Sequence, residues 1–415
     1  MAQSDQAAQK GHFIKANSPN FLLVVFAASL FIAVMFGGRG SLSLTIEGIV
    51  QSDYLNYLQI SFSFALGQLV TGAVAPFSGM LADKYGIGKT LILGVLMTIM
   101  GCLLIPLSSS PITLSISLGI ISSIGIGIAG LPVVLASVNR LIEPRKVGLA
   151  FGLVNAGQSL GQLVIAPLAG FIVLKFGWVT FIYFLCLLFL IIMPCSFILR
   201  SRLEENDNSD ANEVGLKKTL SIAFKTPSYI YLVSGFFVCG FHVAFIATHM
   251  PGVIAVCGLS PVVSGWSLGL IGLFNIIGSI FAGWYISQRS MRYFLFYIYL
   301  SRSVIVLLFL LSPKDLLSIL FFSAALGFTF FSVIPATAGL IGKMFGAKFM
   351  ATLFGFALFS HQIGGFLGAY FGGYFFTLTG DYTVFWLLDA GLAIFAALIH
   401  LPIRERLVFD HRQTI

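Results

Sequence analysis

The sequence predicts an all-α membrane protein with twelve transmembrane helices in two pseudo-symmetric six-helix bundles. The 415 residues are 58% hydrophobic and only 9% charged, with a mean hydropathy of +0.99, whereas soluble domains are about 25% charged. Apolar runs long enough to cross about 30 Å of hydrocarbon recur along the whole chain. The second half of the chain also repeats landmarks of the first half.

Twelve apolar runs define the expected helices. The first run is too long for a cleavable signal peptide, contains Arg39 and follows no small-residue cleavage pattern. The runs cover residues 21–46, 58–77, 91–107, 114–138, 148–173, 181–199, 229–254, 262–286, 294–311, 317–341, 352–376 and 384–403.

The net charge of +8 is explained by topology. With both termini in the cytoplasm, 19 Lys and Arg residues fall on that side, 2 on the opposite side and 2 within helices. Such an excess of cations is typical of cytoplasmic loops. We therefore expect an integral protein of the cytoplasmic (inner) membrane with both termini cytoplasmic. No nucleic-acid partner is needed to explain the charge.

The longest internal polar stretch, residues 200–226, separates six expected helices from the other six. Its low hydrophobicity is typical of a flexible linker. The expected organisation is a cytoplasmic segment 1–20, a six-helix bundle 21–199, the cytoplasmic linker 200–226, a second bundle 227–403 and a cytoplasmic tail 404–415.

The two halves share landmarks at a nearly constant spacing. A shift of 203 residues pairs Pro132 with Pro335, Gly152 with Gly355 and Gly177 with Gly380, and a shift of 204 pairs Gly79 with Gly283. Repeats related by an axis normal to the membrane place the substrate site between them.

The five cysteines lie in or beside apolar helices without metal-ligand spacing, so we interpret them as reduced small hydrophobes. The sequence contains no P-loop, no dinucleotide fingerprint and no paired nucleophile and base. We expect no metal, no cofactor and no enzymatic activity.

The stretch 79–89 reads GMLADKYGIGK and connects the second and third apolar runs. A chance polar turn at a membrane surface would also use glycines, which permit φ > 0, and lysines, which stay near headgroups. The stretch resembles the loop between helices 2 and 3 of major facilitator superfamily transporters, roughly G-x-L-A-D-[RK]-x-G. The resemblance covers the chain from residue 21 onward.

This resemblance implies the major facilitator fold and a gate on the cytoplasmic side. The residues to which it gives a gating role are Gly79, Asp83, Gly86 and Lys89. The carboxylate of Asp83 would meet the N-terminus of helix 11 and nearby basic groups such as Lys348.

Stretches 37–41, 240–251, 271–275 and 359–365 resemble the monocarboxylate transporter and oxalate/formate antiporter branch of the superfamily. The chain departs from that branch on helix 8. Asn275 and Ser279 stand where monocarboxylate transporters carry an acid and an arginine. Arg39, together with His242, would then have to supply the positive field.

Ionisable groups at membrane depth cost about 2.5–3.5 kcal/mol on insertion scales. Arg39 lies past the midpoint of helix 1, and its guanidinium suits a carboxylate; alternatively it caps helix ends or meets Glu47. His242 in helix 7 suits a proton carrier or a hydrogen-bond donor, or is a core histidine bonded to a carbonyl. His249 is expected to be structural or part of an outer gate.

The candidate substrate-binding residues are Arg39, His242, Asn275, His361, Gln158 and Gln162. The 203 shift pairs Gln158 with His361, so these polar groups either line the cavity or bond the halves together. Arg302 in helix 9 and Asp389 in helix 12 reach a similar depth. They are expected to form a structural ion pair or a proton relay.

We expect a monomeric secondary active transporter that moves a small, monocarboxylate-like organic anion by alternating access, driven by proton symport or anion exchange. An exporter of drugs or of a polycarboxylate metal chelator (a siderophore) is the alternative in the same class. A substrate sensor with this fold would normally need a cytoplasmic domain or a long tail.

Overall fold

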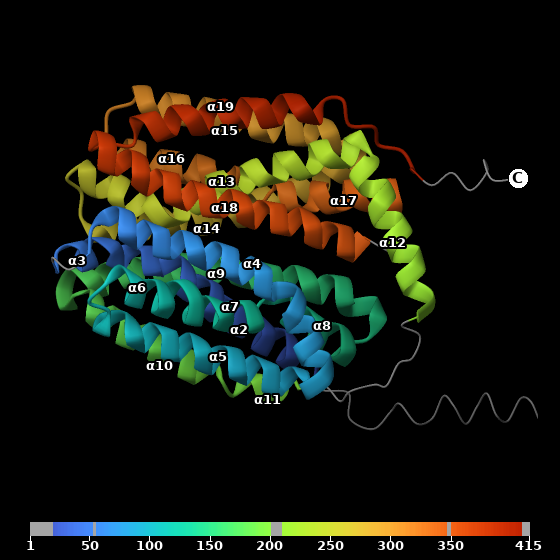
Figure 1. The fold of residues 1–415 in the computed structure, drawn as a ribbon, viewed down its shortest axis with the longest axis horizontal. Helices are drawn as coiled ribbons and strands as arrows, with labels where there is room; N and C mark the ends of the chain where they lie inside the picture. Colours follow the sequence, from blue (N-terminus) through green and yellow to red (C-terminus); the bar gives the residue numbers. More distant parts are fainter. Residues whose placement is uncertain (1–19, 53–54, 201–209, 347–349, 409–415) are drawn as a thin grey trace, which may run out of the picture.

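The computed structural model describes residues 20–52, 55–200, 210–346 and 350–408, which form two helical halves lying side by side (Figure 1). The N-half contains α2 to α11 and the C-half contains α13 to α19. We call the end at which α2 begins and α19 finishes the termini end, and the opposite end the far end.

The N-half begins with a long first helix in three parts. Its helices are α2 (Phe21–Ser41), a 3₁₀ turn η1 (Leu42–Thr45), α3 (Ile46–Val50), α4 (Tyr57–Tyr85), α5 (Ile87–Leu104), a 3₁₀ turn η2 (Ile105–Leu107), α6 (Pro111–Leu114), a π-helical stretch η3 (Ser115–Ser122), α7 (Ser123–Ile128), α8 (Leu131–Leu141), α9 (Pro144–Phe176), α10 (Trp178–Ile192) and α11 (Cys195–Ile198).

The C-half follows α12 (Asp210–Lys225), a helix within the segment expected to be a flexible linker. Figure 1 shows α12 at the termini end, running between the two halves. The helices of the C-half are α13 (Pro227–Val256), α14 (Pro261–Gln288), α15 (Met291–Leu311), α16 (Leu316–Thr329), α17 (Val333–Phe345), α18 (Met350–Thr379) and α19 (Thr383–His400).

Within the described residues, 11 helical segments are long and apolar enough to cross a membrane. The twelfth expected helix corresponds to α18, a helix of 30 residues. The predicted all-α fold with twelve helices is thus confirmed.

Local sequence explains where many of these helices begin. Pro occupies the first position of α9, α13 and α14, where its missing N–H breaks no helical bond. The side chains of Asn56 and Gln59 form a reciprocal capping box at the start of α4. Gly86, at φ 90°, separates α4 from α5 in a backbone conformation that favours glycine.

The halves meet along two helix pairs, α4 with α18 and α9 with α14, which lie at the centre of the view in Figure 1. The α9–α14 pair approaches closely because small residues face each other. A Cβ at Gly265 would overlap the carbonyl oxygen of Ala166 and stand 2.9 Å from Pro167 Cα.

The repeat seen in the sequence has a structural counterpart. The fourth membrane-spanning helix, which comprises α6 to α8, is interrupted at Ala129 and Gly130, between α7 and α8. The tenth, which comprises α16 and α17 and is called helix 10 below, is interrupted at residues 330–332. The paired prolines Pro132 and Pro335 follow these two breaks. The paired glycines Gly177 and Gly380 both have positive φ, at 84° and 74°.

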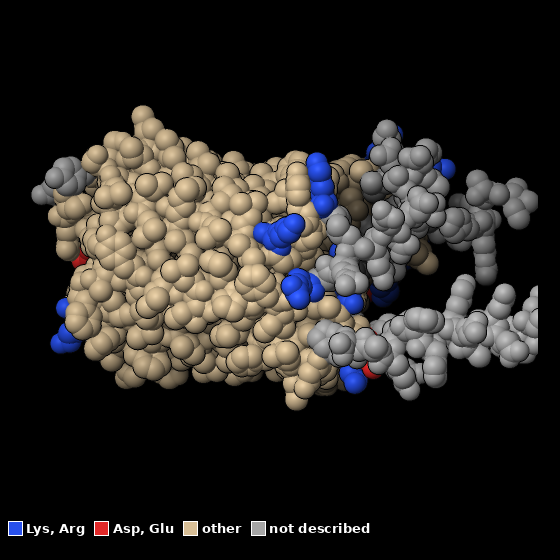
Figure 2. Space-filling view, turned by 90° about the horizontal axis from the view of Figure 1, so that it is seen from below, with Lys and Arg blue, Asp and Glu red and all other residues tan. Residues whose placement is uncertain are grey.

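Charged side chains are distributed unevenly along the molecule. Figure 2 shows Lys and Arg gathered around the termini end, a wide surface without charges over the middle, and a few charges at the far end. An uncharged belt is what a bilayer requires of the surface that it contacts.

Candidate substrate site and buried charges

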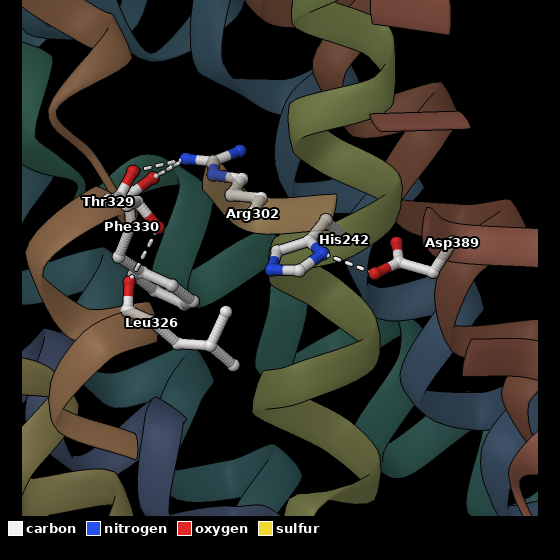
Figure 3. Close-up of polar contacts among 6 residues, drawn as sticks. All are labelled: His242, Arg302, Leu326, Thr329, Phe330 and Asp389. Atoms are coloured by element: carbon white, nitrogen blue, oxygen red, sulfur yellow. Dashed lines mark hydrogen bonds and ion pairs between the residues drawn. The ribbon is translucent and has the colours of Figure 1, made fainter. Parts of the chain in front are cut away.

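The interruption of helix 10 is held by side chains from two other helices. Arg302 of α15 donates through Nη2 to the carbonyl oxygens of Thr329 and Phe330, at 2.6 Å from the latter (Figure 3). Asn275 of α14 accepts from the backbone N–H of Phe331 at 3.0 Å. Backbone groups freed by the break therefore find partners, as they must at membrane depth.

Asp389 pairs with His242 and not with Arg302. The expected ion pair between Arg302 and Asp389 is therefore wrong. Asp389 Oδ2 lies 2.5 Å from His242 Nδ1, and the two residues are 0% and 2% exposed (Figure 3). Arg302 is instead drawn to the carbonyls at the end of α16, where the helix dipole attracts a cation.

His242 is consequently not a cavity-lining residue in this structure. Its ring is turned into the C-half, toward α19. His242 Nε2, Asp389 Oδ1 and the Nε and Nη1 atoms of Arg302 are buried without a hydrogen-bond partner among the described residues. Unpaired buried polar atoms are rare, so each of them calls for an explanation.

Arg39 lies near the end of α2 and its environment is mainly neutral. Its Nη2 donates to Oε1 of Gln68, on α4, at 2.5 Å. The ion pairs found among the described residues do not include Arg39, and Glu47 instead bonds to Gln51. A guanidinium bonded to one neutral amide keeps further donors for an anion.

Two contacts place Arg39 close to the boundary between the halves. Gln68, its partner, has its Cβ 3.7 Å from where a Cβ would stand at Gly365 of α18. One turn before Arg39, the ring of Phe36 lies 6.1 Å from that of Phe331, in the break of helix 10.

Asn275 joins the halves instead of facing a cavity. Its Nδ2 donates to Ser159 Oγ on α9 at 2.8 Å, its Oδ1 accepts from Phe331, and it is only 8% exposed. Because these bonds engage both ends of its amide, the structure gives it a positioning role at the break of helix 10.

The remaining expected polar residues are divided among different surroundings. Gln158 is half-buried and donates to Asn155 of its own helix at 2.8 Å. Gln162 is buried against Gly272 of α14. His361 is half-buried, with Nδ1 3.3 Å from Gln362 Oε1 and its ring 4.9 Å from that of Phe236.

The predicted gating stretch crosses from α4 into α5. Gly79 lies in the last turns of α4, Gly86 forms the turn and Lys89 is exposed in the first turn of α5. The side chain of Asp83 and the proposed partner Lys348 lie outside the described residues.

A gate-like contact occurs at the far end and was only partly anticipated. Tyr57 of the N-half places its hydroxyl 2.8 Å from His249 Nδ1 and 2.6 Å from the hydroxyl of Tyr382, both in the C-half. His249 Nε2 lies 2.7 Å from the carbonyl oxygen of Ala369. Since a carbonyl only accepts, Nε2 carries the proton and Nδ1 accepts from Tyr57.

The sequence marked His249 but gave no signal for the two tyrosines, since tyrosine at a helix end is ordinary at a membrane interface. Gln68 was visible as a polar residue in an apolar run but was not singled out. Within the described residues, no group of three or more His, Cys, Asp or Glu side chains is arranged to hold a metal ion.

This arrangement of two six-helix halves around paired, interrupted helices defines a class of membrane transporters. A sequence model of the Major Facilitator Superfamily matches residues 23–369, and the chain belongs to this superfamily. The family and the relatives below are transporters rather than enzymes.

Among curated proteins, the chain is similar to an uncharacterized MFS-type transporter, YcxA, of Bacillus subtilis, with 25% identity over 86% of this chain and 89% of the relative. It is similar to monocarboxylate transporter 13 of Bos taurus, with 24% identity over 92% and 89%. Monocarboxylate transporter 12 of Xenopus laevis is 21% identical over 83% and 80%. These matches confirm the resemblance to the monocarboxylate transporter branch.

Solved structures share the fold at low sequence identity. A D-xylose–proton symporter superposes with a TM-score of 0.73 and 13% identity, over 92% of this chain and 98% of that one. A bacterial homologue of the human lysosomal transporter Spinster, in an inward-facing and unoccupied conformation, gives 0.68 and 14%, over 94% and 99%.

Proposed function

We propose that this transporter moves a small organic anion of the monocarboxylate type across the cytoplasmic membrane by alternating access. Arg39 carries the proposal. It is a guanidinium at the boundary between the halves, bonded to the neutral Gln68 and not part of the ion pairs found in the described residues. A carboxylate bound there by two parallel hydrogen bonds would neutralise it.

The relatives named monocarboxylate transporters support this substrate class. In this proposal the polar side chains of Gln162, His361 and Gln362 would complete the site. Asn275 would act indirectly, by holding Phe331 in the break of helix 10. The gradient that drives transport would be of protons or of a second anion.

We further propose that the termini end faces the cytoplasm, because most of the Lys and Arg residues belong to that end. In that orientation the stretch from Gly79 to Lys89 gates the cytoplasmic side and the Tyr57–His249–Tyr382 contact closes the outer side. The protein would work as a monomer, since each polypeptide contains both halves of the site.

Ligand-dependent thermal stabilisation of the purified protein tests the substrate class. A panel of mono-, di- and tricarboxylates is compared with cationic drugs, and a ligand at about 100 times its Kd adds about 2.7 kcal/mol of stability. We expect stabilisation by a carboxylate, its loss in Arg39→Gln and its retention in Arg289→Gln, which removes an exposed arginine.

Two results would contradict the proposal. Carboxylate stabilisation that persists in Arg39→Gln would exclude Arg39 as the anion site. A flat response to every acid, with stabilisation by a drug or a chelator, would indicate an exporter instead.

A further inference from the structure

We propose that His242 and Asp389 form the proton-binding site of this transporter, inside the C-half, and that Arg302 couples it to the break in helix 10. The inference rests on the proposed transport function and decides its driving ion in favour of the proton. It places the proton away from Arg39, which binds the substrate.

The His242–Asp389 pair has the chemistry of a single-proton site. With one proton on Nδ1, shared with Asp389 Oδ2 across 2.5 Å, the imidazole is neutral and Nε2 is a bare acceptor. Nε2 has no partner among the described residues and is buried. A proton taken from water adds to Nε2, gives an imidazolium stabilised by the carboxylate, and leaves from the same atom.

Arg302 senses this change because it lies in the same polar cluster. Cys239, one turn before His242 on α13, has its Sγ 4.0 Å from the carbonyl oxygen of Phe330, which also accepts from Arg302. Residues three apart on a helix are neighbours, about 5–6 Å between Cβ atoms. Tyr299 of α15 also contacts Arg302, with its ring centroid 5.2 Å from the guanidinium carbon.

Protonation changes the charge balance of this cluster. Arg302 and Asp389 cancel while His242 is neutral, and the cluster becomes positive when the imidazole gains a proton. Because the surroundings are apolar, the added charge acts strongly on Arg302. Two of its guanidinium nitrogens, Nε and Nη1, have no partner among the described residues, so its present position rests on the carbonyls of the break.

A set of contacts leads from Arg302 to the proposed substrate site. Arg302 holds the carbonyl oxygens of Thr329 and Phe330. The next residue, Phe331, packs its ring 6.1 Å from that of Phe36, one turn from Arg39 on α2. A shift of Arg302 would therefore reach Arg39 through the break, which in this proposal is the element that changes its arrangement.

A proton-binding role also explains why the fold retains a buried polar pair that lowers its stability. Replacing a buried charged pair by apolar residues of the same volume is often neutral or stabilising, and this pair also has two unsatisfied atoms. His249, on the same helix, shows the contrast, since both of its ring nitrogens have partners. The unsatisfied pair belongs to a site that must bind and release a proton.

The first test needs no substrate: infrared difference spectra of the purified full-length protein on acidification. We expect bands of the imidazole and the carboxyl group that disappear in both His242→Gln and Asp389→Asn and persist in Asp315→Asn, which removes an exposed carboxylate. Arg302→Gln is expected to shift the frequencies of these bands, because a neighbouring positive charge is lost. Bands that persist in both pair variants would overturn the proposal.

The second test separates coupling from transport in proteoliposomes, with the carboxylate that stabilises the protein. His242→Gln and Asp389→Asn are expected to retain self-exchange of that carboxylate but lose accumulation driven by a pH gradient. If Asp389→Asn does not fold, Asp389→Glu should keep the gradient response with an altered pH profile. Accumulation that stays proton-driven in the folded variants would refute the assignment, as would loss of exchange together with accumulation.

The two proposals fail in different ways. If no carboxylate binds to the wild-type protein, the proposed substrate class is wrong, while the infrared experiment still decides whether the pair takes up a proton.

Discussion

The two ends of the molecule differ in how the halves meet, although α4, α9, α14 and α18 form the boundary at both ends. At the far end, Gly170 of α9 and Gly373 of α18 are packed against the other half, on Pro261 and Ser61. Tyr57 adds hydrogen bonds between the halves. The far end is therefore closed by direct contact.

At the termini end, the corresponding helices carry four glycines without such contacts. Apart from neighbouring residues of the same helix, no atom of the described residues lies within 4 Å of where a Cβ would stand at Gly79, Gly152, Gly283 or Gly355. These are the two pairs related by the internal repeat. In the alternating-access cycle proposed above, these glycines would let the termini end close in another conformation.

The largest effect is expected from a bulky residue at one end of α14. Gly265→Val would collide with Ala166 and Pro167 across the boundary. Overpacking typically costs about 1–3 kcal/mol, which corresponds to roughly a tenfold to hundredfold shift away from the conformation closed at the far end. Gly283→Val, on the same helix at the termini end, meets open space and should leave this conformation intact.

Pulsed electron spin resonance distances measure this shift in a cysteine-free background. Labels at the exposed positions Lys84 and Arg289 report on the termini end, and labels at Lys175 and Lys314 on the far end. Gly265→Val should bring the first pair closer and separate the second. Gly283→Val should suppress the short distances at the termini end. Identical distance distributions in Gly265→Val and Gly283→Val would show that glycine packing does not distinguish the far end from the termini end.

The sequence predicted the fold, the internal repeat and the turn at Gly86, because hydropathy and glycine chemistry are local properties. It did not predict which way His242 faces. Helix α13 is apolar all round, so no amphipathic face marks the side that meets the cavity. The sequence predicted how far along a helix a residue lies, but not which side of the helix its side chain faces.

The same limit explains the error over Arg302. Arg302 and Asp389 were matched by depth alone, and the competing partners of Arg302 are backbone carbonyls at the end of α16. Those carbonyls are available only because helix 10 breaks before Pro335. A proline can break a helix, but its presence in the sequence does not show that the helix breaks there. Asn275 was likewise assigned from its alignment with the family, whereas its bonds lead to Ser159 and Phe331.

A smaller effect is expected from the hydroxyl of Tyr57. Tyr57→Phe keeps the ring but leaves the buried His249 Nδ1 without its donor, a loss of about 1–3 kcal/mol. The far end should open more often, and the distances between labels at Lys175 and Lys314 should lengthen. Tyr297→Phe, on an exposed tyrosine of α15, is the matched control. An unchanged far end in Tyr57→Phe would show that glycine packing alone closes it.

The smallest effect is expected where a polar contact joins elements of one half only. Glu405 accepts from the N–H of Arg292 at 2.9 Å and from Ser290, and pairs with Lys343 at 3.0 Å. Burial raises the pKa of the Glu405 carboxyl, but the bonds from Arg292, Ser290 and Lys343 outweigh it and leave the pKa below its ordinary value. A lowered pKa means stability that is present at neutral pH and lost as the pH falls through the folded-state value.

Glu405→Gln should therefore lower thermal stability at pH 7 by at most about 1 kcal/mol, because Lys343 is half exposed and screened by solvent. The difference from the wild type should shrink below about pH 4, where a carboxyl with an ordinary pKa is already protonated. Melting curves across this pH range measure it. The label distances at both ends should not change, because every partner of Glu405 belongs to the C-half. A shift in those distances would mean that the balance between the two ends is set within one half as well as at the boundary.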